Sequence, residues 1–126
     1  MNRPWLISAV LLLVAAVHLL PLLGVLGTPR LLQLYDLHIE EPNLLLLMRH
    51  RAALFGLLGA LLAAAAFKPE WQGLALLAAW GSVLGFVLLA PPGLLPAVRR
   101  VWWIDVALLP LLALASWAWW GRDNQR

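Results

Sequence analysis

The sequence predicts an all-α membrane protein, an antiparallel up-down-up-down bundle of four transmembrane helices with a short interfacial helix in its first loop. The chain has 126 residues, of which 63% are hydrophobic and 12% are charged, whereas soluble domains are roughly 45–50% apolar and about 25% charged. Four apolar runs each reach the roughly 20 residues with which a helix crosses a bilayer. These runs are rich in Leu and Ala without an alternation of period two, which favours helices over the strands of a β-barrel.

The four predicted spans occupy most of the chain and leave no segment for a soluble domain. They cover residues 5–26, 44–67, 71–90 and 101–120. We therefore expect residues 1–126 to form a single integral membrane domain. The first run follows Arg3 and has the apolar character of a secretory signal peptide. It is longer than such a peptide, so we interpret it as a retained span.

The connections between the spans predict how the helices are ordered in space. Lys68–Glu70 joins spans 2 and 3, and a loop of about ten residues that ends at Arg99-Arg100 joins spans 3 and 4. Short connections make neighbouring helices antiparallel. The first connection, residues 27–43, is longer, and its amphipathic segment Leu31–Tyr35 predicts a short helix at the membrane interface. No internal repeat is evident, which disfavours an inverted-repeat transporter.

The orientation follows from the basic residues outside the spans. Four spans place both termini and the connection between spans 2 and 3 on one face of the membrane, here called side A, and the opposite face is side B. Side A carries Arg3, Lys68, Arg122 and Arg126, and side B carries Arg30, Arg99 and Arg100 when Arg49 and Arg51 are counted inside span 2. This balance of four against three favours a cytoplasmic side A in a bacterial inner membrane, and it also permits dual topology.

The ionisable residues inside the predicted spans gather in the half of the membrane next to side B. They are His18, Arg49, His50, Arg51 and Asp105. Such groups are rare and costly inside a membrane, so each one marks a candidate site. The side A half has few polar side chains by comparison, namely Ser8, Trp80 and Ser116. We therefore expect a polar pocket that is built by spans 1, 2 and 4 and opens to side B.

Asp105 is the only carboxylate within the spans, and a buried carboxylate needs a partner. The nearest opposite charges by depth are Arg49 and Arg51, so we expect an ion pair with one of them. Successive helical residues are 100° apart, so these two arginines and His50 cannot all face one cavity. Three interpretations stay open: the ion pair locks the helices together, it lines a pocket, or the partner of Asp105 lies in another chain.

Further candidate ligand-binding residues flank these charges. The loop before span 2 adds Glu40, Glu41 and Asn43 at the side B end. Glu41-Pro42-Asn43 also has the pattern of a helix start, so capping and solvation explain these residues equally well. His18 fits a core histidine with satisfied hydrogen bonds as well as a ligand-binding histidine.

Few classes of chemistry fit the sequence. The chain has no Cys, no HExxH motif and no glycine-rich phosphate loop, and its nine Lys and Arg residues are too scattered for a nucleic-acid surface. The spacing of His38, Glu40 and Glu41 is generic for a metal site, and haem would need His18 and His50 at matching depth, so we expect no metal and no cofactor. His50 and Asp105 are the candidates for acid/base catalysis, with an arginine to hold an anionic group.

Several segments resemble a known group of proteins. They are Met1–Pro4, His18–Pro21, Leu34–Leu37, Glu41–Asn43, Met48–Ala52 and Phe55–Gly59, together with Arg99-Arg100 ahead of Asp105. Over nearly the whole chain they resemble small four-span bacterial membrane proteins that are similar to DoxX-like proteins in size and layout. The resemblance implies the four-span fold and no settled activity. Chains of this kind are often labelled phosphopantetheine adenylyltransferase, a name that implies an HxGH motif, and this sequence has none.

Taken together, these features predict a small membrane protein that binds, or converts by acid/base chemistry, an amphiphilic or lipid-like molecule in a polar pocket near one leaflet. The alternatives are a small dimeric transporter or channel, and an accessory subunit of a larger membrane complex. A transporter needs a polar path through both halves of the membrane, which the side A half lacks. The expected partners are membrane lipids, the amphiphile and a second copy of the chain, since Gly81 and Gly85 have the GxxxG spacing of packed helices.

Overall fold

The computed structural model describes residues 3–126, and all regular elements within this range are helices. Helix α1 (Pro4–Leu19) continues as the 3-10 segment η1 (Leu20–Leu26), which is followed by the short helix α2 (Thr28–Tyr35). Helix α3 (Pro42–Ala65), the 3-10 turn η2 (Pro69–Trp71), α4 (Gln72–Leu89) and α5 (Pro96–Asp123) complete the chain. The short helix expected in the first connection is therefore present.

Four helical stretches are long and apolar enough to cross a membrane. They are Pro4–Leu26, Pro42–Ala65, Pro69–Leu89 and Pro96–Asp123. The first three lie within two residues of the predicted spans at each end. The fourth begins at Pro96 instead of residue 101, so the predicted loop ending at Arg99-Arg100 is wrong. Proline suits the first turn of a helix, and the amide of Arg99 already donates to the Leu95 carbonyl at 2.8 Å.

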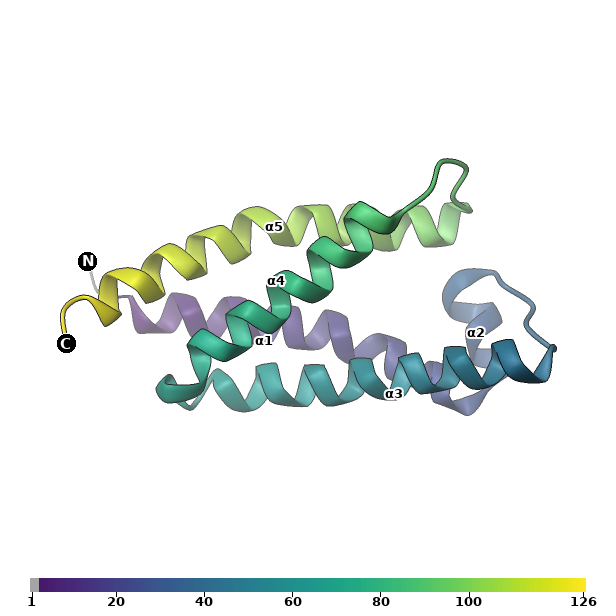
Figure 1. Ribbon diagram of the computed structural model, residues 1–126, viewed down its shortest axis with the longest axis horizontal. Helices are drawn as coiled ribbons and strands as arrows, with labels where there is room; N and C mark the ends of the chain where they lie inside the picture. Colours follow the sequence, from purple (N-terminus) through teal and green to yellow (C-terminus); the bar gives the residue numbers. More distant parts are fainter. Residues whose placement is uncertain (1–2) are drawn as a thin grey trace.

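The helices place their ends and loops at two opposite ends of the molecule (Figure 1). The start of α1, the end of α5 and η2 lie at one end, and α2 lies with the α4–α5 loop at the other end. We call these the side A end and the side B end. Helix α1 packs against α3 and α5, and α4 packs mainly against α5. Helix α4 begins beside α3 and ends beside α5, so α3 and α4 diverge toward the side B end (Figure 1).

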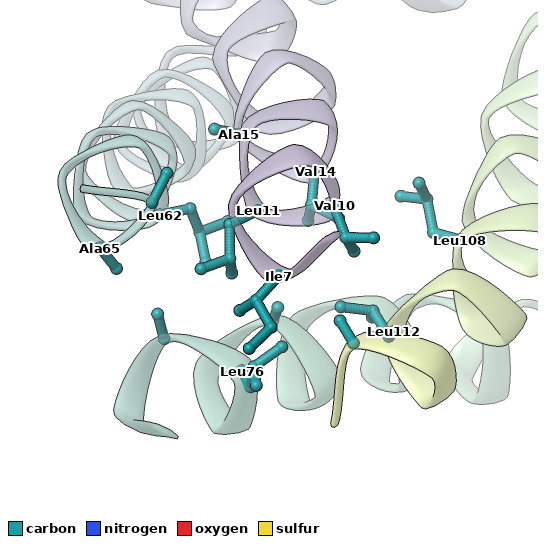
Figure 2. Packing of buried hydrophobic residues seen from close by; sticks show 14 of the residues in the cluster. Ile7, Val10, Leu11, Val14, Ala15, Leu62, Ala65, Leu76, Leu108 and Leu112 are labelled. Atoms are coloured by element: carbon teal, nitrogen blue, oxygen red, sulfur yellow. The ribbon is translucent and has the colours of Figure 1, made fainter. Parts of the chain in front are cut away.

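Helix α1 carries the centre of the apolar core. Its buried side chains recur every three or four residues, and Figure 2 shows them between α3, α4 and α5. Leu11 contacts the cluster that includes Leu62 of α3 and Leu112 of α5, and all three are fully buried. This layer of packed apolar side chains lies between the side A end and the polar residues near side B.

Helix α2 is held against the other helices by a second, smaller cluster. Leu31 and Tyr35 of α2 and Ile39 of the following loop are buried, with partly buried apolar residues of α3 and α5 around them. The Thr28 hydroxyl donates to the Ile39 carbonyl at 2.6 Å and closes the loop. One face of α2 is thus buried against protein, which fixes the position of Tyr35.

The outer surface of the four long helices is apolar. Leu57, Leu77, Leu88, Leu89 and Trp103 are among the many large hydrophobic side chains that are exposed. A water-soluble protein rarely exposes so much contiguous apolar surface. An apolar outer face is typical of an integral membrane protein, whose helices contact lipid.

Candidate functional site

Three of the predicted site residues meet around one small cavity near the side B end. His18, Arg51 and Asp105 line it from α1, α3 and α5, together with Tyr35 of α2 and Phe86 of α4. Val17, Pro21, Phe55 and Val101 complete its wall. We call this the inner cavity. Its volume of about 30 Å³ is enough for one or two water molecules and too small for the body of an amphiphile.

His18 is a core histidine with both ring nitrogens bonded. Its Nδ1 lies 2.8 Å from the Val14 carbonyl oxygen, and its Nε2 lies 2.8 Å from the Ser82 hydroxyl oxygen. A carbonyl only accepts hydrogen bonds, so Nδ1 carries the hydrogen, and in the neutral ring Nε2 accepts from Ser82. Phe55 covers the ring at a centroid distance of 5.5 Å. His18 therefore fixes α1 to α4 and shapes the cavity wall.

Arg51 is the one member of the Arg49-His50-Arg51 triplet that lines the inner cavity. Its Nη1 donates to the Tyr35 hydroxyl at 3.3 Å, and its guanidinium lies over the Phe55 ring at 4.6 Å from the centroid. Arg49 points elsewhere and donates from Nε to the Val25 carbonyl at 2.8 Å. His50 is exposed and is not among the residues that line this cavity. The three side chains thus diverge, as their 100° spacing requires.

Asp105 lies opposite Arg51 without touching it. Its side chain is only 8% exposed. Within residues 3–126 it takes part in no hydrogen bond, and neither Arg49 nor Arg51 comes within the 4.0 Å of an ion pair with it. The expected contact ion pair with Arg49 or Arg51 is therefore wrong. Arg51 directs its guanidinium at Tyr35 and Phe55, so its charge acts on Asp105 only across the cavity.

The acidic residues of the loop before α3, Glu40 and Glu41, are exposed, unlike the buried residues His18 and Asp105 of the inner cavity. Glu41 caps α3: its carboxylate accepts from the backbone amides of Asn43 at 3.0 Å and Leu44 at 2.7 Å. These bonds lower the pKa of Glu41, because they stabilise its ionised form. Glu40 pairs with His38 at 2.9 Å, and Asn43 donates to Glu41. All four side chains are exposed, so the structure gives them capping and surface contacts. Within residues 3–126, no three His, Asp or Glu side chains gather as metal ligands would.

An open groove adjoins the inner cavity on the side where α3 and α4 diverge. It has a volume of about 170 Å³ and is lined by Tyr35, Leu37, Met48, Arg51, Phe86 and Val98. We call it the lateral groove. Tyr35, Arg51 and Phe86 line both spaces. Its other walls are apolar, so a polar centre at Arg51 adjoins an apolar channel at the outer surface.

Sequence reasoning missed several residues of the site. Phe55 and Phe86 are aromatic residues inside apolar runs and carry no polar signal, although Phe55 lies four residues after Arg51 and so shares its helix face. Ser82 is the one hydroxyl residue of α4 and could have been found as a partner for His18. Tyr35 was expected at the interface, where its role in orienting Arg51 was not foreseen.

The side A half contains one polar residue that the sequence analysis overlooked. Gln72 at the start of α4 is buried, and its Oε1 accepts a hydrogen bond from Arg122 at 2.7 Å. Trp80 donates to the Ser116 hydroxyl at 2.9 Å, and Ser8 donates to the Ala66 carbonyl at 2.7 Å. These side chains bond to one another or to the backbone, and the apolar core separates them from the inner cavity.

Comparison with known proteins finds no relative of this chain. No protein-family model, no curated protein and no solved structure matches the chain. The resemblance to DoxX-like proteins therefore stays a prediction.

Proposed function

We propose that the protein is an antiparallel four-helix bundle of a bacterial inner membrane that binds an amphiphilic molecule, with the polar head of the ligand at Arg51 and its apolar part in the lateral groove. One observation carries this proposal: Arg51 lies where the polar inner cavity meets the apolar groove. The membrane location is supported by four helices that are long and apolar enough to cross a membrane.

Arg51 has the free hydrogen-bonding capacity that a head group needs. A guanidinium has five N–H donors in a planar fork. Within residues 3–126, the guanidinium of Arg51 makes a single hydrogen bond, the 3.3 Å contact with Tyr35. No carboxylate is in contact with it. Arginine forks bind phosphate and carboxylate groups with paired hydrogen bonds, so an anionic head group is the chemistry that this position favours.

The alternatives of transport and of a subunit role have less support. A transporter needs polar groups through both halves, yet the polar side chains near side A are bonded to one another and an apolar core separates them from the cavity. Contact with a second copy has one favourable feature. Gly81 and Gly85 have open space beside them on α4, which suits close helix packing. His50 lies outside the cavity, so we propose binding and assign no reaction.

The orientation is part of the proposal. Arg49 and Arg51 belong to α3, and Arg99, Arg100 and Arg122 belong to α5. The basic residues outside the long helices are then Arg3, Lys68 and Arg126 at the side A end and Arg30 at the side B end, an excess that favours a cytoplasmic side A. The termini are then cytoplasmic, and the inner cavity lies near the opposite leaflet. A fluorescent protein fused after Arg126 should be bright, whereas a phosphatase that works only in the periplasm should be silent there. Activity of both reporters would indicate dual topology instead.

Binding can be tested with lysophosphatidic acid, an amphiphile with one chain and a phosphate. The purified protein in mild detergent would be titrated and the bound lipid counted by native mass spectrometry. We expect Arg51→Gln to weaken binding about tenfold or more, because the charged hydrogen bonds to the phosphate are lost. Arg51→Lys should retain part of the affinity.

Arg49→Gln is the matched control, since Arg49 is two residues away on the same helix and bonds to the Val25 carbonyl. It should leave binding within about twofold of the original protein. Equal losses in both variants, or no loss in either, would contradict the assignment of Arg51 as the head-group anchor.

A further inference from the structure

We infer that the ligand of this site is a phosphoethanolamine amphiphile, whose phosphate lies at Arg51 and whose primary ammonium enters the inner cavity and bonds to Asp105. This inference rests on the proposed function and specifies its ligand. It begins from the one polar group of the cavity that has no partner.

Asp105 is a mostly buried residue whose carboxylate oxygens stay accessible to a water-sized molecule and accept no hydrogen bond within residues 3–126. More than nine tenths of the residue is buried, and none of the hydrogen bonds within residues 3–126 reaches its carboxylate. Burial of a carboxylate without hydrogen bonds is costly. In this structure its neighbours direct their donors elsewhere: His18 is bonded to Val14 and Ser82, and Arg51 is turned toward Tyr35 and Phe55. The carboxylate lines the cavity, so a molecule inside the cavity can donate to it.

The size of the cavity limits what this molecule presents. A volume of about 30 Å³ admits a group of the size of a water molecule. A primary ammonium has this size, whereas the trimethylammonium of a choline head is much larger. Phe55, Phe86 and Tyr35 in the wall offer aromatic rings to a cation. The cavity thus favours a small cationic donor over a bulky one.

The charges on the two sides of the cavity indicate that this donor belongs to a zwitterion. Arg51 and Asp105 line one cavity but lie more than 4.0 Å apart, so neither neutralises the other by contact. A purely anionic head would satisfy Arg51 and leave Asp105 without a donor. A purely cationic head would be repelled by Arg51. A phosphate joined by two carbons to an ammonium presents both charges in the required order.

Two sources supply this head group, a membrane phospholipid and soluble glycerophosphoethanolamine. The apolar walls of the lateral groove, which include Leu37, Met48 and Val98, would contact acyl chains and give the lipid the advantage. The test therefore includes both sources.

The experiment compares head groups on identical acyl chains by native mass spectrometry of the purified protein. The ligands are phosphatidylethanolamine, its mono-, di- and trimethylated forms, and phosphatidylglycerol, with soluble glycerophosphoethanolamine in a separate arm. We expect phosphatidylethanolamine to bind about tenfold more tightly than the trimethylated lipid, with the affinity falling at each methylation. This series uses the unaltered protein, so it does not depend on whether a variant folds.

Asp105→Asn should remove the preference for the primary ammonium and bring the ethanolamine and choline lipids within about twofold of each other. Asp36→Asn, which changes an exposed acid at the same end of the molecule, should retain the preference. Arg51→Gln should weaken every phosphate lipid.

The outcomes separate the two proposals. Equal affinity for all head groups, or a preference for phosphatidylglycerol, overturns the ammonium assignment and leaves the proposed function standing. Absence of binding by every lipid overturns both. Binding of soluble glycerophosphoethanolamine as tightly as the lipid supports the head-group chemistry and assigns the ligand to the aqueous phase.

Discussion

At the side A end, the polar side chains that lie between the helices are bonded to one another, whereas at the side B end a buried carboxylate faces a cavity without a donor. Gln72 accepts from Arg122, and Trp80 donates to Ser116. Asp105 is similarly buried and makes no such bond within residues 3–126. The two ends share one apolar core, so they differ in whether their buried polar side chains have hydrogen-bond partners within the protein.

This difference separates polar residues that stabilise the fold from polar residues that are available to a ligand. A hydrogen bond between side chains of two helices contributes to stability. When one partner is removed, the other is left buried without a hydrogen bond, which lowers the free energy of unfolding. A buried group without a partner lowers stability and is typical of a functional site, where stability is given up for binding. Substitutions at the two ends of the molecule test this distinction.

The largest effect is expected where α1 contacts α3, because the two helices approach closely at Gly59. A side chain at Gly59 would meet the Leu19 side chain at 2.8 Å and the Ala15 carbonyl oxygen at 3.2 Å. Gly59→Leu should therefore force the two helices apart and lower the free energy of unfolding by about 3 kcal/mol. Thermal unfolding in detergent, followed by circular dichroism, measures this loss.

Gly81→Leu is the control, since nothing lies within 4 Å of a Cβ atom added at that position. It should leave the unfolding temperature unchanged or raise it slightly, because Leu favours helix more than Gly does. Equal destabilisation by Gly59→Leu and Gly81→Leu would show that Gly81 also packs against another helix, as it would against a second copy of the chain in a dimer.

The next effect concerns the bonded pair at the side A end. Arg122→Met keeps a long apolar stem but removes the donor of Gln72, which is only 2% exposed. A buried acceptor without its partner costs about 2 kcal/mol. Arg126→Met, which changes an exposed arginine near the same end, should have a much smaller effect. Similar unfolding curves for the two variants would show that the side A pair contributes nothing to stability.

The corresponding substitution at the side B end should not lower the free energy of unfolding. Asp105→Asn removes a buried carboxylate that makes no hydrogen bond within residues 3–126, so no partner is left unsatisfied. The free energy of unfolding of the ligand-free protein should stay the same or rise, because the desolvation cost of the carboxylate is relieved. A loss as large as that of Arg122→Met would contradict the comparison and restore a structural ion pair.

The smallest effect is expected at the cap of α3, and it depends on pH. Hydrogen bonds from Leu44 and Asn43 lower the pKa of Glu41, so its cap stabilises the helix when the carboxylate is ionised. This contribution is fully present above the ordinary pKa of glutamate and is lost as the pH falls through the lowered pKa of the folded state. The difference in unfolding temperature between the original protein and Glu41→Gln should therefore shrink on acidification. A difference that stays constant, or that Glu70→Gln reproduces, would exclude the cap.

The sequence predicts the helices of this protein better than it predicts their contacts. Span limits depend on local hydropathy, which is why three of the four spans were placed within two residues at each end. The presence of His18, Arg51 and Asp105 at one site followed from their rarity in membranes. The choice between Arg49 and Arg51 depends on the rotation of α3 about its axis, which Leu-rich sequence around a whole helix does not encode.

The apolar part of the site was harder to predict for a related reason. Phe55 and Phe86 look like ordinary lipid-facing or core residues until α3 and α4 are placed against each other. Gln72 was missed because a neutral amide at the end of a span carries no charge to attract attention. Each of these residues acquires its role only from a neighbour on another helix.

The divergence of α3 from α4 has a consequence for how a ligand would reach Arg51. The lateral groove is lined by residues of α3, α4 and α5, which are long and apolar enough to cross a membrane, together with Tyr35 and Leu37. A molecule dissolved in the leaflet would reach it by diffusion in two dimensions, without leaving the lipid. Occupancy would then follow the mole fraction of that molecule among the surrounding lipids, and dilution of the surrounding water would leave it unchanged.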